Sequence, residues 1–165
     1  MILQDQYINM QKTVSISELV YDDVTSEIKN LLNQSKRASS SAYAPFSEFY
    51  VGCSVLHQNG TIIRGSNQEN SSFPSGMCAE RVALFESSKN LSNNKVSKIA
   101  IYAKSNRYKV PDILVPCAGC LQVISDIRNR QKSSIEIWMW GGGDIVFMAE
   151  DVSQFLPFHF ELTKK

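Results

Sequence analysis

Short runs of strand-forming residues alternate with segments of helical spacing along most of this chain, and this alternation limits the folds it can adopt. A helix is expected over residues 26–38, where Thr25 and Ser26 can cap its first turn. FYVGCSVLH, QNG and TIIRG then have the composition of strand, turn and strand, which predicts a β-hairpin. Interleaved strands and helices form a sheet covered by helices, so three layers are predicted.

The second half of the chain continues the alternation. A helix begins within Pro74–Phe85, and another begins at Cys117 after a loop that contains two prolines. Three further strands are expected, at Lys98–Ala103, at Ser134–Trp140 and, after three glycines, at residues 144–149. With the hairpin, the predicted number of strands is five.

Residues 1–165 are expected to form one domain, because this length suffices for one sizeable core. Residues 1–24 read as an N-terminal extension, in which alternating apolar positions between Tyr7 and Ile16 make a candidate edge strand. The net charge of +1 includes no basic block, so no nucleic-acid partner is expected. The chain has neither an apolar run of membrane-spanning length nor the layout of a secretory signal, which predicts a cytoplasmic protein without a membrane partner.

Three of the four cysteines, Cys78, Cys117 and Cys120, lie at the predicted starts of two helices. In a reducing compartment, a Cys-x-x-Cys pair is more typical of metal or redox chemistry than of a disulfide. Free N–H groups at a helix start stabilise a thiolate and lower the pKa of its thiol. Two helix starts that face each other could present three thiolates to one zinc ion. A fourth position open to water is the catalytic arrangement, because zinc makes bound water acidic near neutral pH.

Glu80 lies two residues after Cys78, close to the expected metal without being needed as a ligand. A carboxylate in this place could take a proton from water and pass it to a leaving group. Two other interpretations stay open at this stage. Cys53 could complete a structural site of four thiolates, although its position in mid-strand is more typical of a small core residue. Arg81 could be an ordinary solvated side chain.

The cysteine motifs resemble those of a known family. CAER, from Cys78 to Arg81, and PCAGC, from Pro116 to Cys120, are similar to the two zinc motifs of the small, homotetrameric cytidine deaminases. AYAPFSEFYVG, NQENSSF and FLPFHF resemble that family's first loop and strand, its nucleoside-binding segment and its C-terminal tail, in the same order. The likeness extends from about Ala42 to Phe160. It implies an α/β fold, a three-layer α/β/α sandwich with a mixed five-stranded sheet, and a homotetramer with shared active sites.

The resemblance also implies a reaction. One zinc ion per chain would be held by Cys78, Cys117 and Cys120, and Glu80 would move protons during the hydrolytic deamination of cytidine and 2′-deoxycytidine in pyrimidine salvage. Arg81 would offset the negative charge of the thiolates.

Five further residues would contact the nucleoside. The resemblance assigns hydrogen bonds to the ribose hydroxyls to Asn67 and Glu69 and stacking on the pyrimidine to Phe49. It places Ala79 beside the substrate, and it makes Phe160 close over the base from a neighbouring subunit.

Three positions depart from the family's pattern. Leu121 stands where an arginine is usual, Phe73 where tyrosine is frequent, and Cys53 where alanine is usual. Without the second arginine, only Arg81 and the helix dipoles remain to offset the thiolates. An electron-rich metal site would then make bound water less acidic, unless Leu121 simply lies on the core face of its helix.

Alternative functions remain. Another small cytosine compound, such as blasticidin S, could be the substrate, although the Asn-x-Glu-Asn segment favours a ribose. A deaminase that edits polynucleotides is disfavoured by the near-zero net charge. The alternative of a different class is a non-enzymatic zinc-binding module, which would use four cysteines rather than three.

Overall fold

The computed structural model describes residues 11–162, and a mixed six-stranded sheet forms its centre. The strand order is β1-β6-β5-β4-β2-β3, in which only β4 and β5 run parallel. The strands are β1 (Ser17–Val20), β2 (Phe49–His57), β3 (Ile62–Ser66), β4 (Val96–Ser105), β5 (Glu136–Trp140) and β6 (Ile145–Ala149).

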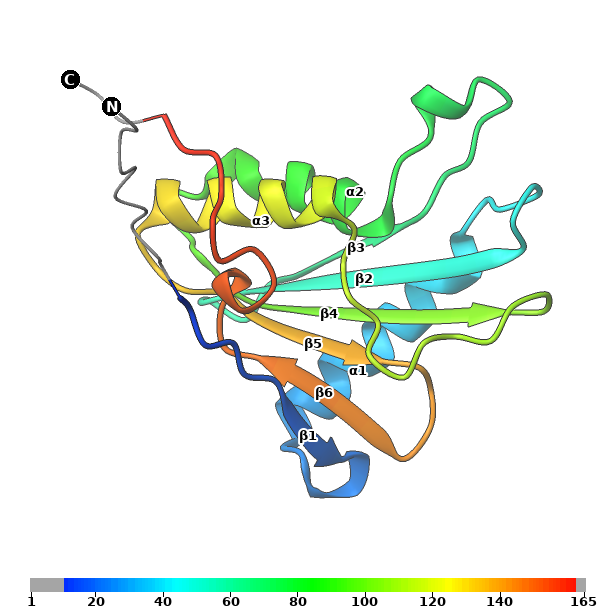
Figure 1. The fold of residues 1–165 in the computed structure, drawn as a ribbon, viewed down its shortest axis with the longest axis horizontal. Helices are drawn as coiled ribbons and strands as arrows, with labels where there is room; N and C mark the ends of the chain where they lie inside the picture. Colours follow the sequence, from blue (N-terminus) through cyan, green and yellow to red (C-terminus); the bar gives the residue numbers. More distant parts are fainter. Residues whose placement is uncertain (1–10, 163–165) are drawn as a thin grey trace, which may run out of the picture.

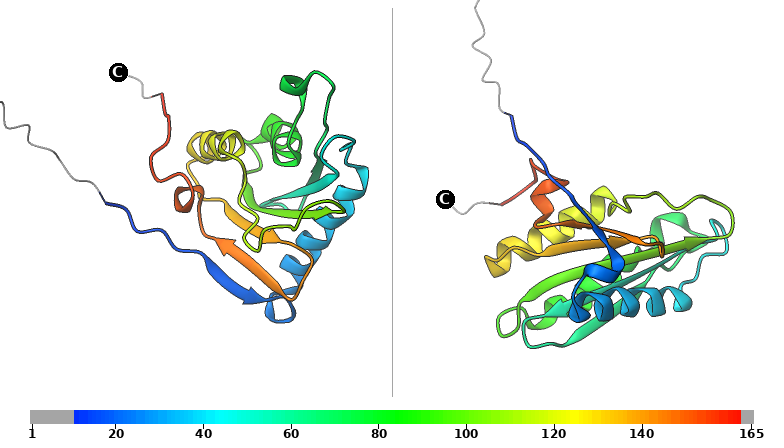
Figure 2. Two further views of the ribbon diagram at one scale, coloured as in Figure 1. Left: turned by 45° about the vertical axis from the view of Figure 1, so that its right-hand side comes forward. Right: turned by 90° about the horizontal axis from the view of Figure 1, so that it is seen from below.

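Three helices cover the two faces of this sheet. α1 (Ser26–Ala38) lies on one face, whereas α2 (Ala79–Ser87) and α3 (Ala118–Gln131) lie side by side on the other (Figures 1 and 2). The predicted three layers are therefore present. Short 3₁₀ turns occupy Tyr21–Asp23, Ser39–Ser41, Phe73–Ser75, Ser88–Asn90 and Val152–Gln154. No helix within residues 11–162 is long and apolar enough to cross a membrane.

The predicted count of five strands is wrong, because β1 adds a sixth strand at the sheet edge. It pairs antiparallel with β6, beginning with Ser17 opposite Met148. The edge strand was expected between Tyr7 and Ile16, but residues 11–16 have no regular structure and residues 7–10 lie outside the described part. The short SELV stretch has little pattern of its own, and its strand depends on the backbone groups that β6 offers.

Alternation along the strands separates two apolar cores. In β2, Cys53 and Val55 belong to the core under α2 and α3, whereas Leu56 belongs to the core under α1. Trp138 and Trp140 both lie in the core under α1, as expected for residues two apart in a strand. The other core therefore supports the two helices that carry the cysteine motifs.

Candidate active site

Two helix starts carry the predicted metal ligands. Cys78 and Cys117 are the residues immediately before α2 and α3, and Cys120 is buried in the first turn of α3. α2 can lie directly on the sheet because Gly65 is beneath its first turn, where a Cβ would be 2.4 Å from the carbonyl oxygen of Ala79. Since the two helices pack side by side, their first turns meet at the same end of the layer (Figure 1).

The three thiols form a compact cluster. The Sγ of Cys117 lies 3.7 Å from the Sγ of Cys78 and 3.4 Å from the Sγ of Cys120. All three sulfur atoms are within 4.8 Å of one another, and no second group of potential metal ligands is found among the described residues. Cys53 lies apart, fully buried in β2, where desolvation raises the pKa of its thiol. The structural site of four thiolates is therefore not formed.

The charges of this cluster fit a cation. A hydrogen bond from Cys120, followed by those from Arg81 and Cys117, lowers the pKa of Cys78 to about 5 although partial burial opposes the shift. The same contact with Cys78, together with burial, raises the pKa of Cys120 far above its ordinary value. Three sulfurs at these distances cannot all ionise without a positive charge between them. A dication with an affinity for thiolates, such as zinc, supplies that charge.

Glu80 lies in the first turn of α2 and is only 6% exposed. Burial raises the pKa of its carboxyl, and the nearby charge of Cys78 adds to the rise, while backbone hydrogen bonding opposes it. A buried carboxyl with a raised pKa, beside a cluster of metal ligands, is suited both to accept and to return a proton.

Arg81 is not an ordinary solvated side chain. Its Nη2 lies 3.6 Å from the Sγ of Cys78, to which it donates, and its Nε is buried without a hydrogen-bond partner. The guanidinium therefore faces the thiol cluster, where its charge opposes that of the sulfurs.

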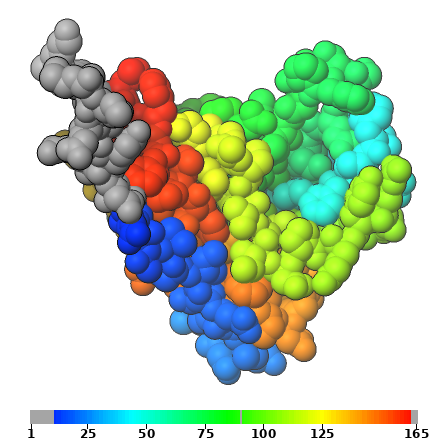
Figure 3. All heavy atoms as spheres, in the orientation of Figure 1, coloured from blue at the N-terminus to red at the C-terminus, as the bar shows by residue number. Residues whose placement is uncertain are grey.

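A cleft of about 330 Å³ opens beside Cys78. Figure 3 shows the hollowed face between the segments coloured cyan, green and yellow-green. The cleft is lined by Phe46, Asn67, Gln68, Glu69, Asn70, Phe73, Gly76, Met77 and Cys78. A larger cavity of about 470 Å³, beside β6 and the loop at residues 110–112, includes none of the cysteine motifs.

Sequence reasoning missed Phe46, which forms one wall of this cleft together with Phe73. Phe46 and Phe73 meet edge to face, with ring centroids 5.4 Å apart and planes at 75°, and both rings are exposed. The only sequence signal for Phe46 was its place in the APFS loop, and an aromatic residue in a loop has many ordinary explanations.

Asn67 and Glu69 line the cleft, but their side chains also hold the chain around it. The Asn67 Oδ1 accepts from the N–H of Val51 at 2.7 Å, and its Nδ2 donates to the carbonyl of Phe49 at 2.9 Å. The Glu69 carboxylate accepts hydrogen bonds from the N–H of Phe46 at 2.8 Å and from the N–H and the hydroxyl of Ser47. Although desolvation opposes it, these hydrogen bonds lower the pKa of the Glu69 carboxyl, so an ionised acceptor faces the cleft.

The remaining predicted substrate residues have different positions. Ala79 is fully buried at the start of α2, directly after Cys78. Phe49 begins β2 and packs partly buried against the core under α2 and α3, outside the residues that line the cleft. Phe160 is 69% exposed beside α3, and it is also absent from the cleft of its own chain.

Leu121, which follows Cys120, is buried with 6% exposure and belongs to the core under α2 and α3. Its side chain thus lies on the core face of α3, in the same cluster as Ile124 and Ile127. The departure from arginine at this position replaces a charge by a packing contact.

The fold, the thiol cluster and the buried carboxyl fit a zinc-type nucleoside or nucleotide deaminase, and comparison with known proteins shows this class. Residues 25–134 match the family described as cytidine and deoxycytidylate deaminase zinc-binding region, and the chain belongs to this family.

Similar proteins with assigned activities are cytidine deaminases. The cytidine deaminase of Halalkalibacterium halodurans is 38% identical over 97 residues, which are 59% of this chain and 69% of that protein. The cytidine deaminase of Sporosarcina psychrophila is 34% identical over 103 residues, 62% of this chain and 71% of that protein. A crystal structure of cytidine deaminase from Burkholderia pseudomallei aligns with a TM-score of 0.66 at 28% identity, covering 83% of this chain and 100% of that one.

Proposed function

We propose that this protein catalyses the zinc-dependent hydrolysis of cytidine and 2′-deoxycytidine to uridine and 2′-deoxyuridine, with release of ammonia. The observation that carries the proposal is the cluster of three thiols beside a buried Glu80 at the edge of a cleft. The similarity to curated cytidine deaminases supports the choice of substrate.

Cys78, Cys117 and Cys120 would hold one zinc ion per chain, since three sulfur donors suit this metal. When bound, zinc would supply a Lewis acid that lowers the pKa of water. The Arg81 guanidinium would stabilise the thiolates by offsetting part of their charge.

Glu80 would carry the protons of the reaction. As a carboxylate, it accepts a proton from the attacking water. As the acid, which its raised pKa favours, it donates that proton to N3 of the pyrimidine. In a second transfer, Glu80 takes the remaining proton of the hydroxyl added at C4 and gives it to the amino group, so that the C4–N bond breaks, the C4 carbonyl forms and ammonia leaves. Burial of Glu80 limits exchange of these protons with bulk water.

Asn67 and Glu69 would receive the ribose. The Glu69 carboxylate lies in the cleft as an acceptor for sugar hydroxyls, and no lysine, arginine or second carboxylate is among the residues that line the cleft. A carboxylate without a lysine or arginine among the lining residues favours an uncharged nucleoside over a nucleotide phosphate at this part of the cleft. The roles of Phe49 and Ala79 against the pyrimidine remain predictions that rest on the family resemblance.

The proposal extends to a homotetramer with shared active sites, acting in cytoplasmic pyrimidine salvage. Its support is that Cys117 is exposed at the metal site while Phe160 projects from the chain away from its own cleft. A neighbouring subunit would therefore complete each site with Phe160. Light scattering coupled to size-exclusion chromatography would measure the assembly directly.

An ultraviolet assay of cytidine conversion, combined with metal analysis, tests the proposal. One zinc ion per chain, turnover that a chelator abolishes and recovery with added zinc are expected. Bound zinc without turnover of any small cytosine compound would instead indicate a zinc-binding module. Turnover of blasticidin S but not of cytidine would leave the chemistry correct and the substrate wrong.

A further inference from the structure

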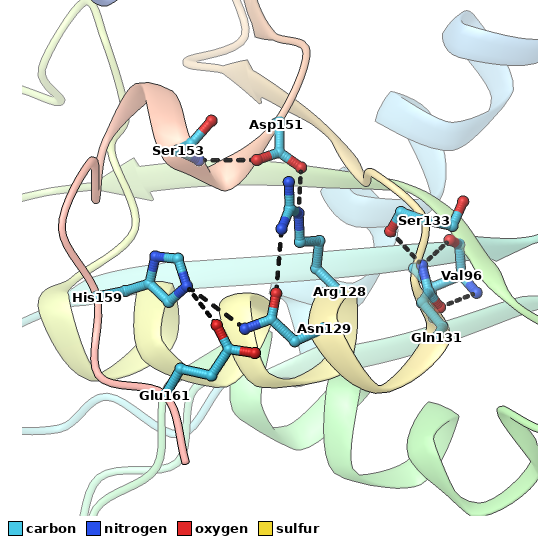
Figure 4. Close-up of polar contacts among 9 residues, drawn as sticks. All are labelled: Val96, Arg128, Asn129, Gln131, Ser133, Asp151, Ser153, His159 and Glu161. Carbon is cyan, nitrogen blue, oxygen red and sulfur yellow. Dashed lines mark hydrogen bonds and ion pairs between the residues drawn. The ribbon is translucent and has the colours of Figure 1, made fainter. Parts of the chain in front are cut away.

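The C-terminal segment, residues 157–162, follows the last 3₁₀ turn and crosses α3 (Figure 1). Its apolar side chains face outward, with exposures of 56% for Phe158, 69% for Phe160 and 84% for Leu162. His159 and Glu161, which alternate with them, point towards α3 (Figure 4). Alternation of this kind is the geometry of an extended chain held along one side.

Two residues of α3 hold this segment. The Nε2 of Gln122 donates to the carbonyl oxygen of Phe160 at 3.0 Å. The Nδ2 of Asn129 lies 3.4 Å from the Nε2 of His159, whose ring is also 3.6 Å from the carboxylate of Glu161. Gln122 and Asn129 are seven residues apart, which is two helical turns, so they lie on the same side of α3.

The amide of Asn129 is itself oriented. Its Oδ1 accepts from Nη1 of Arg128 at 3.1 Å, and Nε of Arg128 donates to Asp151 at 3.2 Å (Figure 4). The Nδ2 of Asn129 is thereby directed to the ring of His159. The segment is thus attached to a fixed network rather than to a single contact.

This attachment keeps Phe160 out of its own cleft. The residues around Phe160 are Gln122, Asp126, Asn129, Arg130, Glu161 and Leu162, none of which lines the cleft beside Cys78. If the Phe160 ring contacts a substrate, that substrate is bound by another copy of the chain. The ring must then point outward from a fixed position along α3.

We infer that Gln122 is a positioning residue for catalysis: by donating to the carbonyl of Phe160 it sets the direction in which that ring is presented to the cleft of a neighbouring copy. Asn129 supports the same backbone through His159. The inference rests on the proposed function in one respect, the contact between Phe160 and the substrate of another subunit. Gln122 thereby links α3, whose start holds Cys117 and Cys120, to the segment that completes the neighbouring site.

The test uses the zinc-loaded full chain. Gln122→Met keeps the length and the lack of charge but removes the donor, and Gln34→Met on α1 is the matched control. KM for cytidine is expected to rise roughly three- to tenfold in Gln122→Met, the size of effect of one hydrogen bond. Because a ring that contacts the base binds the ground state and the transition state alike, kcat should stay within about twofold. Zinc content and Tm should match the parent.

A double-mutant cycle with Phe160→Ala then separates positioning from a general structural role. Gln122→Met should have no further effect on KM once the Phe160 ring is absent. An equal loss in both backgrounds would overturn the inference, as would an unchanged KM in Gln122→Met or an equal rise in Gln34→Met. An unchanged KM in Phe160→Ala would refute the substrate contact and the inference while deamination itself stands. A wild-type protein that fails to convert cytidine would refute the proposed function as well.

Discussion

Replacement of Leu121 by arginine, the residue usual in the family, tests whether this position in the first turn of α3 serves packing or the charge of the thiol cluster. Leu121 is 6% exposed within the core under α2 and α3. The substitution loses the burial of a leucine, about 2 kcal/mol. It also brings a guanidinium into an apolar environment, which costs roughly 2–4 kcal/mol more even if the long side chain finds partial solvation. The free energy of unfolding should therefore fall by about 4–6 kcal/mol, a large share of the ~5–15 kcal/mol typical of a domain.

Thermal and urea unfolding measure this loss. For a chain of this length, the expected decrease in Tm is roughly 10–20 °C, whereas Leu121→Met should cost less than about 1.5 kcal/mol. The competing expectation is that the new arginine reaches the thiol cluster and makes the bound water more acidic. In that case stability stays near that of the parent and the acidic limb of kcat/KM moves to lower pH. A Tm within about 3 °C of the parent would refute the argument from burial.

Glu80→Gln is expected to keep metal and fold but to lose about 10²–10⁴-fold in kcat, because a general acid–base group is removed; near-parental turnover would contradict the assigned role. Burial raises the pKa of Glu80, so the unfolded chain ionises first and the parent loses stability as the pH rises from the unfolded to the folded pKa. Urea unfolding at a series of pH values should therefore show the stability of Glu80→Gln rising relative to the parent as the pH increases above the ordinary carboxyl pKa, and a difference that does not change with pH would contradict the raised pKa. Cys53→Ala should keep one metal ion per chain and lose about 1 kcal/mol of unfolding free energy; loss of the metal would return Cys53 to the site. Asn67→Ala and Glu69→Ala should reduce turnover of cytidine more than that of free cytosine, and equal losses would show that these residues only hold the loop and β2.

Much of the fold and of the metal site could be predicted from sequence, because both rest on local chemistry. Thr25 does cap α1, with its hydroxyl 3.4 Å from the N–H of Ile28. The hairpin of β2 and β3 follows from strand formers on either side of a turn. Cys78 and Cys117 precede helices as predicted, because a helix start and its thiol lie within a few residues of each other.

The tertiary structure decided whatever depends on contacts between distant segments. β1 is a strand because β6 provides its hydrogen-bonding partner, and the sequence pattern of SELV did not predict this pairing. Cys53 and Leu121 entered the core since strand register and helix rotation, set by the packing of whole layers, turned them inward. Phe160 is directed outward by Gln122, thirty-eight positions earlier in the chain. Local propensity acts over a few residues, whereas burial and hydrogen bonding between distant segments exist only once the chain has folded. These long-range contacts determine which side chains reach the site.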